Sequence, residues 1–120
     1  MKALITGQPP VINGDGEQTR DFTFVENVIQ ANIKALLVKD KPGYTIFNVA
    51  CSEQISLNNL WTMLKELSGT DPGISYGPPR SGDIRDSLAD ISRICEALTY
   101  QPGFNVKQGL KITFDWFRRI

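Results

Sequence analysis

Apolar residues recur at helical spacing in three long stretches of the chain, and each stretch predicts an amphipathic helix. The first covers about 25–39 and is ended by the sequence Asp-Lys-Pro-Gly at 40–43. The second follows Ser56, a residue type that caps helix N-termini well, and ends at Gly69. The third follows Asn105, which we expect to cap it in the same way.

Two shorter helices are also expected. The first seven residues look like the opening strand of a dinucleotide-binding fold, but Gln8-Pro9-Pro10 stands where the glycine-rich turn should follow. Because prolines supply no backbone N–H groups to a pyrophosphate, we predict instead that 2–6 is the end of a helix closed by Gly7. The other short helix begins after its cap, Asp90, and ends near Leu98.

Four stretches between these helices predict strands. Residues 11–13 and 74–76 are short, and the latter is expected at a sheet edge. Residues 21–24 alternate polar and aromatic side chains, as an extended segment does. Residues 44–51, with the sequence YTIFNVAC, are β-branched and aromatic with almost no charge. They predict a strand that is buried on both faces and central in its sheet.

The alternation of strands and helices predicts the α/β (or α+β) class, with a small mixed sheet packed with about four helices. The chain has 120 residues, which is enough for one domain and not for two. We therefore expect residues 1–120 to form a single lobe.

The charge balance narrows the choice of partners. Lys plus Arg and Asp plus Glu both number 13, so the formal net charge is zero. This argues against non-specific binding to a nucleic acid or to an anionic membrane surface, because both need an excess of basic residues. The chain has no basic-then-apolar leader and no apolar run near 18 residues. We therefore expect neither a signal peptide nor a membrane span, and a cytoplasmic location.

The cysteine and histidine counts exclude several kinds of site. Cys51 and Cys95 form no CxxC pair, and the chain contains no histidine. A structural zinc site is therefore not expected, and we predict two buried, reduced thiols. Without histidine, Ser-His-Asp and Cys-His mechanisms are also excluded. Asp15, Glu17 and Asp21 lie close together in the sequence, either as an acid–base group or as solvated turn carboxylates.

Two turns carry an arginine each, and they are the strongest candidates for function. Arg20 follows the glycine-rich turn at 14–16, and Arg80 follows Pro78-Pro79. The planar fork of arginine donates two parallel hydrogen bonds to phosphate, so two converging forks would hold a diphosphate. Asp83, three residues beyond Arg80, could accept hydrogen bonds from a ribose diol.

The alternative is that these arginines form surface ion pairs with their sequence neighbours, Arg20 with Asp21 and Arg80 with Asp83. Spacing alone leaves both interpretations open. The functional interpretation depends on whether the two turns meet in space.

The sequence also resembles a known family. Residues 10–22, PVINGDGEQTRDF, and residues 25–28, VENV, resemble the substrate-binding lobe of nucleotide-sugar epimerases and dehydratases. These are the extended short-chain dehydrogenase/reductases, and UDP-glucose 4-epimerase-like enzymes are the nearest type. Other similar segments follow in the family's order and cover nearly the whole chain: 47–50 with 56–57, 76–83 with 85 and 87–90, and 105–117.

The resemblance implies roles for five residues. It aligns Arg20 and Arg80 with the two arginines that contact the sugar-nucleotide diphosphate in the family, and Asp83 with a ribose contact. The strand from Val11 to Asn13 corresponds to backbone contacts with the base, usually uracil. The implied ligand is a UDP-sugar or a similar nucleotide sugar. Ser81 departs from the family pattern, since proline is common at its position.

The resemblance also implies what this chain lacks. The family carries its NAD site and its catalytic Ser/Thr and Tyr-xxx-Lys in an N-terminal Rossmann domain, and no tyrosine here has a lysine four residues later. We therefore expect no cofactor and no catalytic residue in this chain, which would be catalytically incomplete alone. Any activity would need a Rossmann-domain protein in trans, and self-association or another protein would cover the apolar face that the missing domain leaves exposed. The alternatives are a non-enzymatic protein-interaction module and a non-functional truncated fragment.

Overall fold

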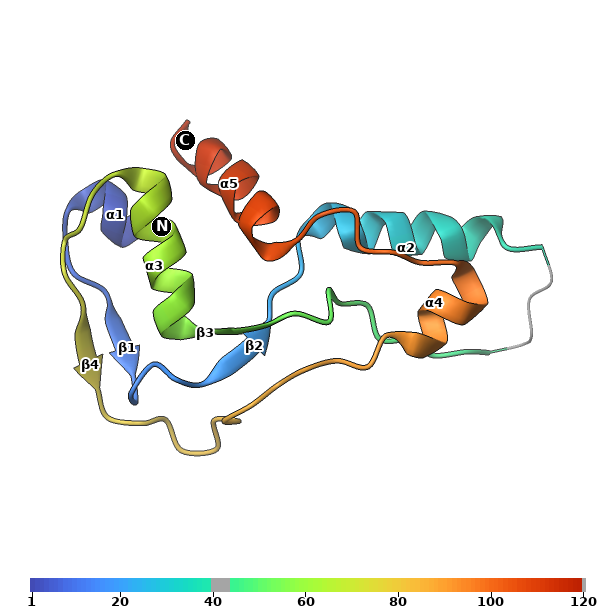
Figure 1. Ribbon diagram of the computed structural model, residues 1–120, viewed down its shortest axis with the longest axis horizontal. Helices are drawn as coiled ribbons and strands as arrows, with labels where there is room; N and C mark the ends of the chain where they lie inside the picture. The colour runs from blue at the N-terminus through green and yellow to red at the C-terminus, as the bar shows by residue number, and fades with distance from the viewer. Residues whose placement is uncertain (40–43, 120) are drawn as a thin grey trace.

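The computed structural model describes residues 1–39 and 44–119. This part of the chain contains five helices and four short strands (Figure 1). In chain order they are α1 (Lys2–Thr6), β1 (Val11–Asn13), β2 (Thr19–Asp21), α2 (Val25–Leu37), β3 (Gln54–Ser56), α3 (Leu57–Ser68), β4 (Ser75–Gly77), α4 (Ser92–Leu98) and α5 (Val106–Phe117).

The strands form two separate two-stranded sheets. β1 and β4 are parallel, with Asn13 opposite Gly77, and β2 and β3 are antiparallel, with Arg20 opposite Ile55. The α/β class predicted from the sequence is therefore confirmed. The prediction of one small mixed sheet is wrong, because the parallel and antiparallel pairs do not join among the described residues.

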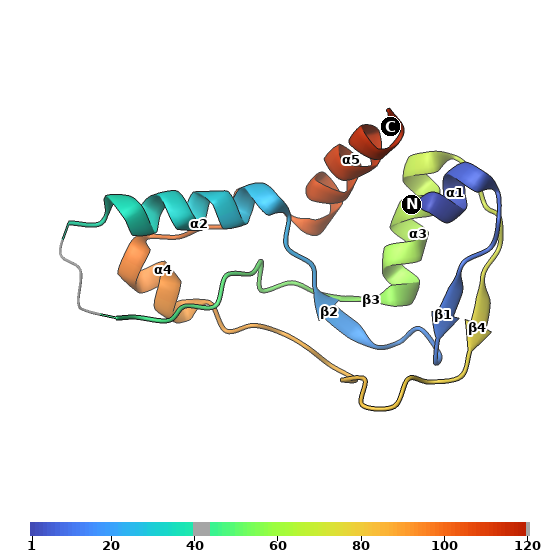
Figure 2. The same cartoon turned by 180° about the vertical axis from the view of Figure 1, so that it is seen from behind.

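Two apolar cores lie at opposite ends of the molecule. One is built among α1, α3 and α5 around Trp61 and Phe114. The other lies between α2 and α4 and contains Ile94 and Tyr100. Figure 1 and Figure 2 show that β2, β3 and long irregular connections run between the two ends.

This arrangement leaves the chain extended. Its dimensions are 52 × 35 × 18 Å, and its radius of gyration is 17.0 Å. A compact domain of this length has a radius of gyration of about 14 Å. The accessible surface is 8036 Å², whereas a monomer of this mass exposes roughly 6,500 Å². The chain therefore exposes roughly 1,500 Å² more than a compact monomer of its size.

None of the helices in the described ranges is long and apolar enough to cross a membrane.

The helix boundaries predicted from local signals are largely confirmed. Gly7 and Gly69 close α1 and α3 in the left-handed conformation. Ser56 and Asn105 cap α3 and α5 through their side-chain oxygens. α4 begins one residue later than predicted, although the Asp90 carboxylate does accept a hydrogen bond from the Ser92 N–H at 2.9 Å. α2 ends at Leu37, and the predicted stop at 40–43 lies outside the described residues.

The predicted central strand at 44–51 is wrong. The segment contains no assigned strand, and alternate side chains point to solvent, with Tyr44 93% and Ile46 65% exposed. A buried strand needs neighbours on both sides, and the strands that this chain supplies pair elsewhere. The residue types in this segment therefore fit an apolar environment that the described chain does not provide.

The strand predicted at 21–24 is displaced toward the N-terminus. The pairing residues are Thr19, Arg20 and Asp21, and Phe24 is already the N-cap of α2. The aromatic alternation at 22–24 misplaced the strand, because the partner β3 aligns with the polar residues before it. Residues 54–56, which end at the predicted helix cap Ser56, supply that partner.

Candidate functional site

The two arginine-bearing turns meet at one edge of the parallel strand pair. Because β1 and β4 are parallel and Asn13 lies opposite Gly77, their carboxyl ends lie together, and one turn leaves each strand there (Figure 1). The Gly14 N–H donates to the Gly77 carbonyl at 2.9 Å and joins the first residues of the two turns. Gly14 and Gly16 adopt φ angles of 80° and 78°, which let the first turn reverse toward β2. Carboxyl ends of parallel strands are a common place for ligands.

A second set of contacts aligns the segment after Arg80 with the first turn. The Thr19 N–H donates to the Arg85 carbonyl at 2.9 Å, and the Thr19 hydroxyl donates to the Asp86 carboxylate at 2.9 Å. The Arg85 guanidinium donates to both carboxylate oxygens of Asp15, at 2.7 and 2.9 Å. The backbone N–H of Glu17 and then Arg85 lower the pKa of Asp15 below its usual value. Asp15 is therefore a charged structural partner of Arg85.

Arg20 forms its ion pair with a residue of the second turn and not with its sequence neighbour Asp21. Its guanidinium donates to the Asp83 carboxylate at 2.5 Å, 63 residues away in sequence. The alternative of local Arg20–Asp21 and Arg80–Asp83 ion pairs is therefore wrong. Asp83, the expected ribose contact, is already engaged by a guanidinium in this structure.

Arg80 stands at the start of a tight turn. The Asp83 N–H donates to the Arg80 carbonyl at 3.2 Å, with Ser81 and Gly82 between them. Gly82 has a φ angle of 79°, as the third position of a type II turn requires. Ser81 therefore does not prevent the turn. The Arg80 side chain is exposed and makes no hydrogen bond or ion pair within the described ranges.

A pocket of about 120 Å³ lies between the two turns, and we call it the turn pocket. Its lining residues are Asn13, Gly14, Asp15, Gln18, Pro79, Arg80, Asp83, Ile84 and Arg85. Its volume is below that of whole-ligand pockets, which begin at about 300 Å³. The turn pocket is therefore large enough for part of a ligand.

The structure brings most of the predicted site residues together. Asn13, Arg80 and Asp83 line the turn pocket, and Arg20 reaches it through Asp83. Val11 does not line it, because it lies at the opposite end of β1, where it is 65% exposed.

Sequence reasoning missed Gln18, Asp15 and Arg85 as lining residues. Gln18 is 7% exposed although it belongs to a polar, glycine-rich stretch. Nothing in the local pattern marks it as buried. The Asp15–Arg85 pair joins residues 70 positions apart, so no spacing rule could have found it.

The three neighbouring carboxylates have separate structural partners. Asp15 binds Arg85, and Glu17 accepts a hydrogen bond from the Asn58 amide at 2.5 Å. Asp21 accepts from the backbone N–H groups of Cys51 and Ser52, both at 3.0 Å. Since the three side chains point to different partners, they do not form the acid–base group considered from the sequence.

The cysteines are free thiols, as predicted, and both are partly buried. Burial raises the pKa of the Cys51 thiol, so it is protonated at neutral pH. Within residues 1–39 and 44–119, no group of three or more His, Cys, Asp or Glu side chains is placed to hold a metal ion.

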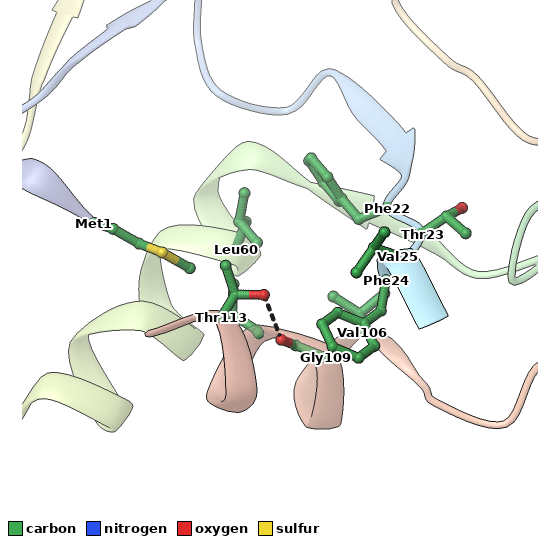
Figure 3. A pocket seen from close by; sticks show the side chains of 10 residues that line it. Met1, Phe22, Thr23, Phe24, Val25, Leu60, Val106, Gly109 and Thr113 are labelled. Atoms are coloured by element: carbon green, nitrogen blue, oxygen red, sulfur yellow. Dashed lines mark hydrogen bonds between the residues drawn. The ribbon is translucent and has the colours of Figure 1, made fainter. Parts of the chain in front are cut away.

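A larger pocket of about 340 Å³ lies between α3, α5 and the segment that leads into α2. Figure 3 shows its walls, which are mainly apolar side chains such as Met1, Phe22 and Leu60. The Thr113 hydroxyl is engaged by the Gly109 carbonyl at 2.8 Å. None of the lining side chains is charged, so none of them offers a cation to a phosphate group. The turn pocket is the better candidate for an anionic ligand.

Comparison with known proteins identifies the relatives of the chain. Residues 1–50 match the NAD dependent epimerase/dehydratase family. The chain is 33% identical to a putative UDP-glucose 4-epimerase of Methanocaldococcus jannaschii, over 96% of this chain and 36% of that protein. It is 34% identical to the UDP-glucose 4-epimerase of Mycolicibacterium smegmatis, over 98% of this chain and 37% of that protein.

Solved structures show the same relationship. The UDP-glucose 4-epimerase of Thermotoga maritima, solved with UDP-glucose, superposes with a TM-score of 0.90 at 35% identity, over 98% of this chain and 37% of that one. The UDP-glucuronic acid 4-epimerase of Bacillus cereus, in complex with UDP-glucuronic acid and NAD, gives a TM-score of 0.93 at 30% identity, over 98% and 38%. The chain thus spans little more than a third of the length of the relatives it matches. It belongs to the NAD-dependent epimerase/dehydratase family, as the counterpart of the C-terminal portion of its nucleotide-sugar epimerases.

Proposed function

We propose that the turn pocket binds the nucleoside diphosphate part of a nucleotide sugar, in the first place a UDP-sugar. The observation that carries the proposal is Arg80, a guanidinium without a partner among the described residues, at the edge where two parallel strands end. Solved structures of the same fold hold UDP-glucose or UDP-glucuronic acid, which supports this class of ligand. The zero net charge of the chain means that the anion is attracted locally, by a few arginines.

Arg20 and Asp83 take part through an exchange of partners. In the structure Arg20 donates to Asp83. A bound diphosphate offers Arg20 a more highly charged acceptor. Asp83 is then released to accept hydrogen bonds from sugar hydroxyls. The base is expected along β1, from Val11 to Asn13, because among the described residues this strand pairs with β4 on one side and has no strand on its other edge.

The proposal assigns binding and no chemistry to this chain. Hydride transfer needs NAD, and removal of the hydroxyl proton needs a positioned base. Both would come from a Rossmann-type domain outside these residues, so no step of the reaction is assigned to them.

The test is a titration with UDP-glucose and UDP-glucuronic acid, followed by heat or by backbone amide shifts. We expect saturable but weak binding by the wild-type chain, because the pocket encloses only part of such a ligand. Arg80→Ala should weaken binding by about 1.5–3 kcal/mol, which is roughly 10- to 150-fold in Kd, since one charge-assisted contact is lost. Arg20→Ala should have an effect of similar size.

The matched control is Arg119→Ala, which removes an exposed arginine after α5. The C-terminal end of α5 lies away from the edge where β1 and β4 end (Figure 1). Its Kd should equal that of the wild type. Absence of saturable binding at millimolar UDP-sugar would overturn the proposal. Unchanged affinity in Arg80→Ala would remove that arginine from the site.

A second candidate function, a docking surface, is favoured by the exposed apolar face of α2. Val25, Ile29 and Ile33 lie at four-residue spacing on one side of the helix and are 48–59% exposed. Leu36 and Leu37 continue this side and are more than 70% exposed. The extended segment 44–49 exposes alternate side chains beside α2 and α4, including Tyr44 and Ile46. We call the α2 side chains and this segment the docking face.

The size of the uncovered surface supports this role. The chain exposes roughly 1,500 Å² more than a compact monomer, and a standard interface buries about 800 Å² on each partner. Monomers rarely leave large contiguous apolar patches uncovered. We propose that the docking face packs against a sheet-bearing NAD-binding domain in trans. The exposed side chains of α2 and of the extended segment beside it offer such a sheet an apolar layer.

The prediction is tested by sedimentation of the chain alone and with the portion of the Mycolicibacterium smegmatis relative that lies outside the match. We expect a complex that Ile33→Asp abolishes, because a charge would then be buried in the interface. Ile5→Asp is the matched control, since Ile5 is 52% exposed on α1 at the opposite end, against 50% for Ile33. It should leave the complex intact. A reversible homodimer that Ile33→Asp dissociates would show that a second copy is the occupant, and would contradict the proposal.

A further inference from the structure

The side-chain amide nitrogen of Gln18 has a hydrogen-bond partner, and its amide oxygen has none among the described residues. Its Nε2 donates to the Asn13 carbonyl at 2.6 Å. Its Oε1 is buried and has no hydrogen-bond partner among the described residues, and the residue as a whole is only 7% exposed. A buried acceptor without a partner costs free energy, so its presence in the turn pocket needs an explanation.

The orientation of this amide is set by its neighbour. Exchanging its oxygen and nitrogen would place Oε1 against the Asn13 carbonyl, and two acceptors would then face each other at 2.6 Å. The observed orientation is therefore the favourable one. It leaves the carbonyl oxygen of Gln18 available for a donor from outside the chain.

The side-chain amide of Gln18 lies close to Gly14 of the first turn, and it lines the turn pocket together with Pro79 of the second turn. A Cβ built on Gly14 would lie 3.8 Å from Gln18 Nε2, 4.0 Å from Gln18 Oε1 and 3.9 Å from Pro79 Cβ. Gln18 and Pro79 therefore both lie next to Gly14, the first residue of one turn. A ligand group that enters the turn pocket would lie against the Gln18 side chain, which is one of its lining residues.

The two carboxylates that line the pocket already have cationic partners. Asp83 accepts from Arg20, and Asp15 accepts from Arg85. Gln18 Oε1 is neutral, so it suits a neutral donor such as a hydroxyl or an imide N–H. It offers nothing to a phosphate group, which is an acceptor at neutral pH.

We infer that Gln18 Oε1 accepts a hydrogen bond from the ribose 2′-hydroxyl of the bound nucleotide, and so contributes to preference for ribonucleotides. This inference rests on the proposed function. Gln18 is bonded to Asn13, at the end of the strand proposed to face the base, and it lines the same pocket as Arg80, proposed to hold the diphosphate. In a nucleoside diphosphate the ribose is the group between base and diphosphate.

The experiment compares UDP with 2′-deoxy-UDP by titration, and it needs no mutation for its first result. The wild-type chain should bind UDP roughly three- to tenfold more tightly, as expected for one hydrogen bond to a neutral acceptor. Gln18→Met keeps the size of the side chain and removes the acceptor. It should weaken UDP binding and bring the UDP to 2′-deoxy-UDP ratio close to one.

The matched control is Gln30→Met. Gln30 also has a buried Oε1 without a partner among the described residues, but it lies on α2 beside a different cavity. Its substitution should leave the ratio unchanged. If the wild-type chain binds neither UDP nor UDP-glucose, the proposed function fails. If it binds UDP and 2′-deoxy-UDP equally, the role of Gln18 fails while the proposed function stands.

A third ligand, cytidine diphosphate, distinguishes ribose from base recognition. Uracil has an imide N–H at the position where cytosine has an acceptor nitrogen. If Gln18→Met changes the UDP to cytidine diphosphate ratio and leaves the UDP to 2′-deoxy-UDP ratio as it was, Gln18 binds the base and the ribose assignment is overturned. If Gln18→Met fails to fold, equal binding of UDP and 2′-deoxy-UDP by the wild-type chain still overturns the role of Gln18.

Discussion

Replacing Asn27 with leucine is expected to lower the free energy of unfolding by about 3–5 kcal/mol, because the fully buried Asn27 side chain loses its hydrogen bonds to the backbone of Gly103 and Phe104. Asn27 is 1% exposed on α2. Its Oδ1 accepts from the N–H groups of Gly103 and Phe104, at 2.9 and 3.1 Å. Its Nδ2 donates to the Phe104 carbonyl at 2.8 Å and contacts the Cys51 sulfur at 3.2 Å. Leucine has a similar volume and would satisfy none of these groups.

Urea unfolding, followed by circular dichroism, measures this change. The control is Asn32→Leu, on the same helix, whose side chain is exposed. It should change the free energy of unfolding by no more than about 0.5 kcal/mol. An equal effect of the two substitutions would mean that helix propensity, and not the buried hydrogen bonds of Asn27, determines stability here.

Tyr100→Ala should also lower the free energy of unfolding by about 3–5 kcal/mol, as large-to-small substitutions of buried aromatic residues do. Tyr100 is fully buried and packs with Ala31 and Ile94 in the smaller of the two cores. Its hydroxyl donates to the Ala50 carbonyl at 3.0 Å. Burial raises the pKa of Tyr100, so the hydroxyl keeps its proton and remains a donor near neutral pH.

Tyr100→Phe separates the two contributions. It keeps the ring and removes the hydroxyl, so about 1 kcal/mol is expected for the lost hydrogen bond. The same urea experiment measures both variants. If Tyr100→Phe were as destabilising as Tyr100→Ala, the hydrogen bond to Ala50 and not the packing of the ring would hold this core together.

These two residues also bear on the docking face. Asn27 contacts Cys51, and Tyr100 donates to Ala50, so both fix the end of the extended segment that follows the exposed residues Tyr44 and Ile46. The core that positions this segment is small and lies apart from the core around Trp61. A partner that covers the docking face would therefore also stabilise the end of the molecule with the smaller core.

Much of the local structure could be predicted because its causes lie within a few residues. Ser56 and Asn105 cap their helices through bonds to the backbone three residues on, and Gly69 closes α3 in a conformation that glycine adopts without strain. The same holds for the turn at 14–16. The sequence also identified the family, because its motifs occur in order along nearly the whole chain.

The strand predicted at 44–51 shows where local reasoning stops. Its residue types predict a buried strand, but a strand exists only where a neighbour pairs with it, and the neighbour is not among the described residues. The β-branched and aromatic residues of 44–51 therefore indicate that this segment is suited to an apolar environment. The fold of this chain alone leaves that segment exposed on the docking face.

The candidate site depends partly on the sequence and partly on the tertiary structure. The sequence alone determined which residue types could bind an anion, Arg20 and Arg80, and placed each after a rigid turn. Only the tertiary structure decided their partners. Parallel pairing of β1 with β4 brings the two turns together, joins Arg20 to Asp83 and buries Gln18 between them. These contacts link residues about 60 positions apart, and only the folded backbone can bring such residues into contact.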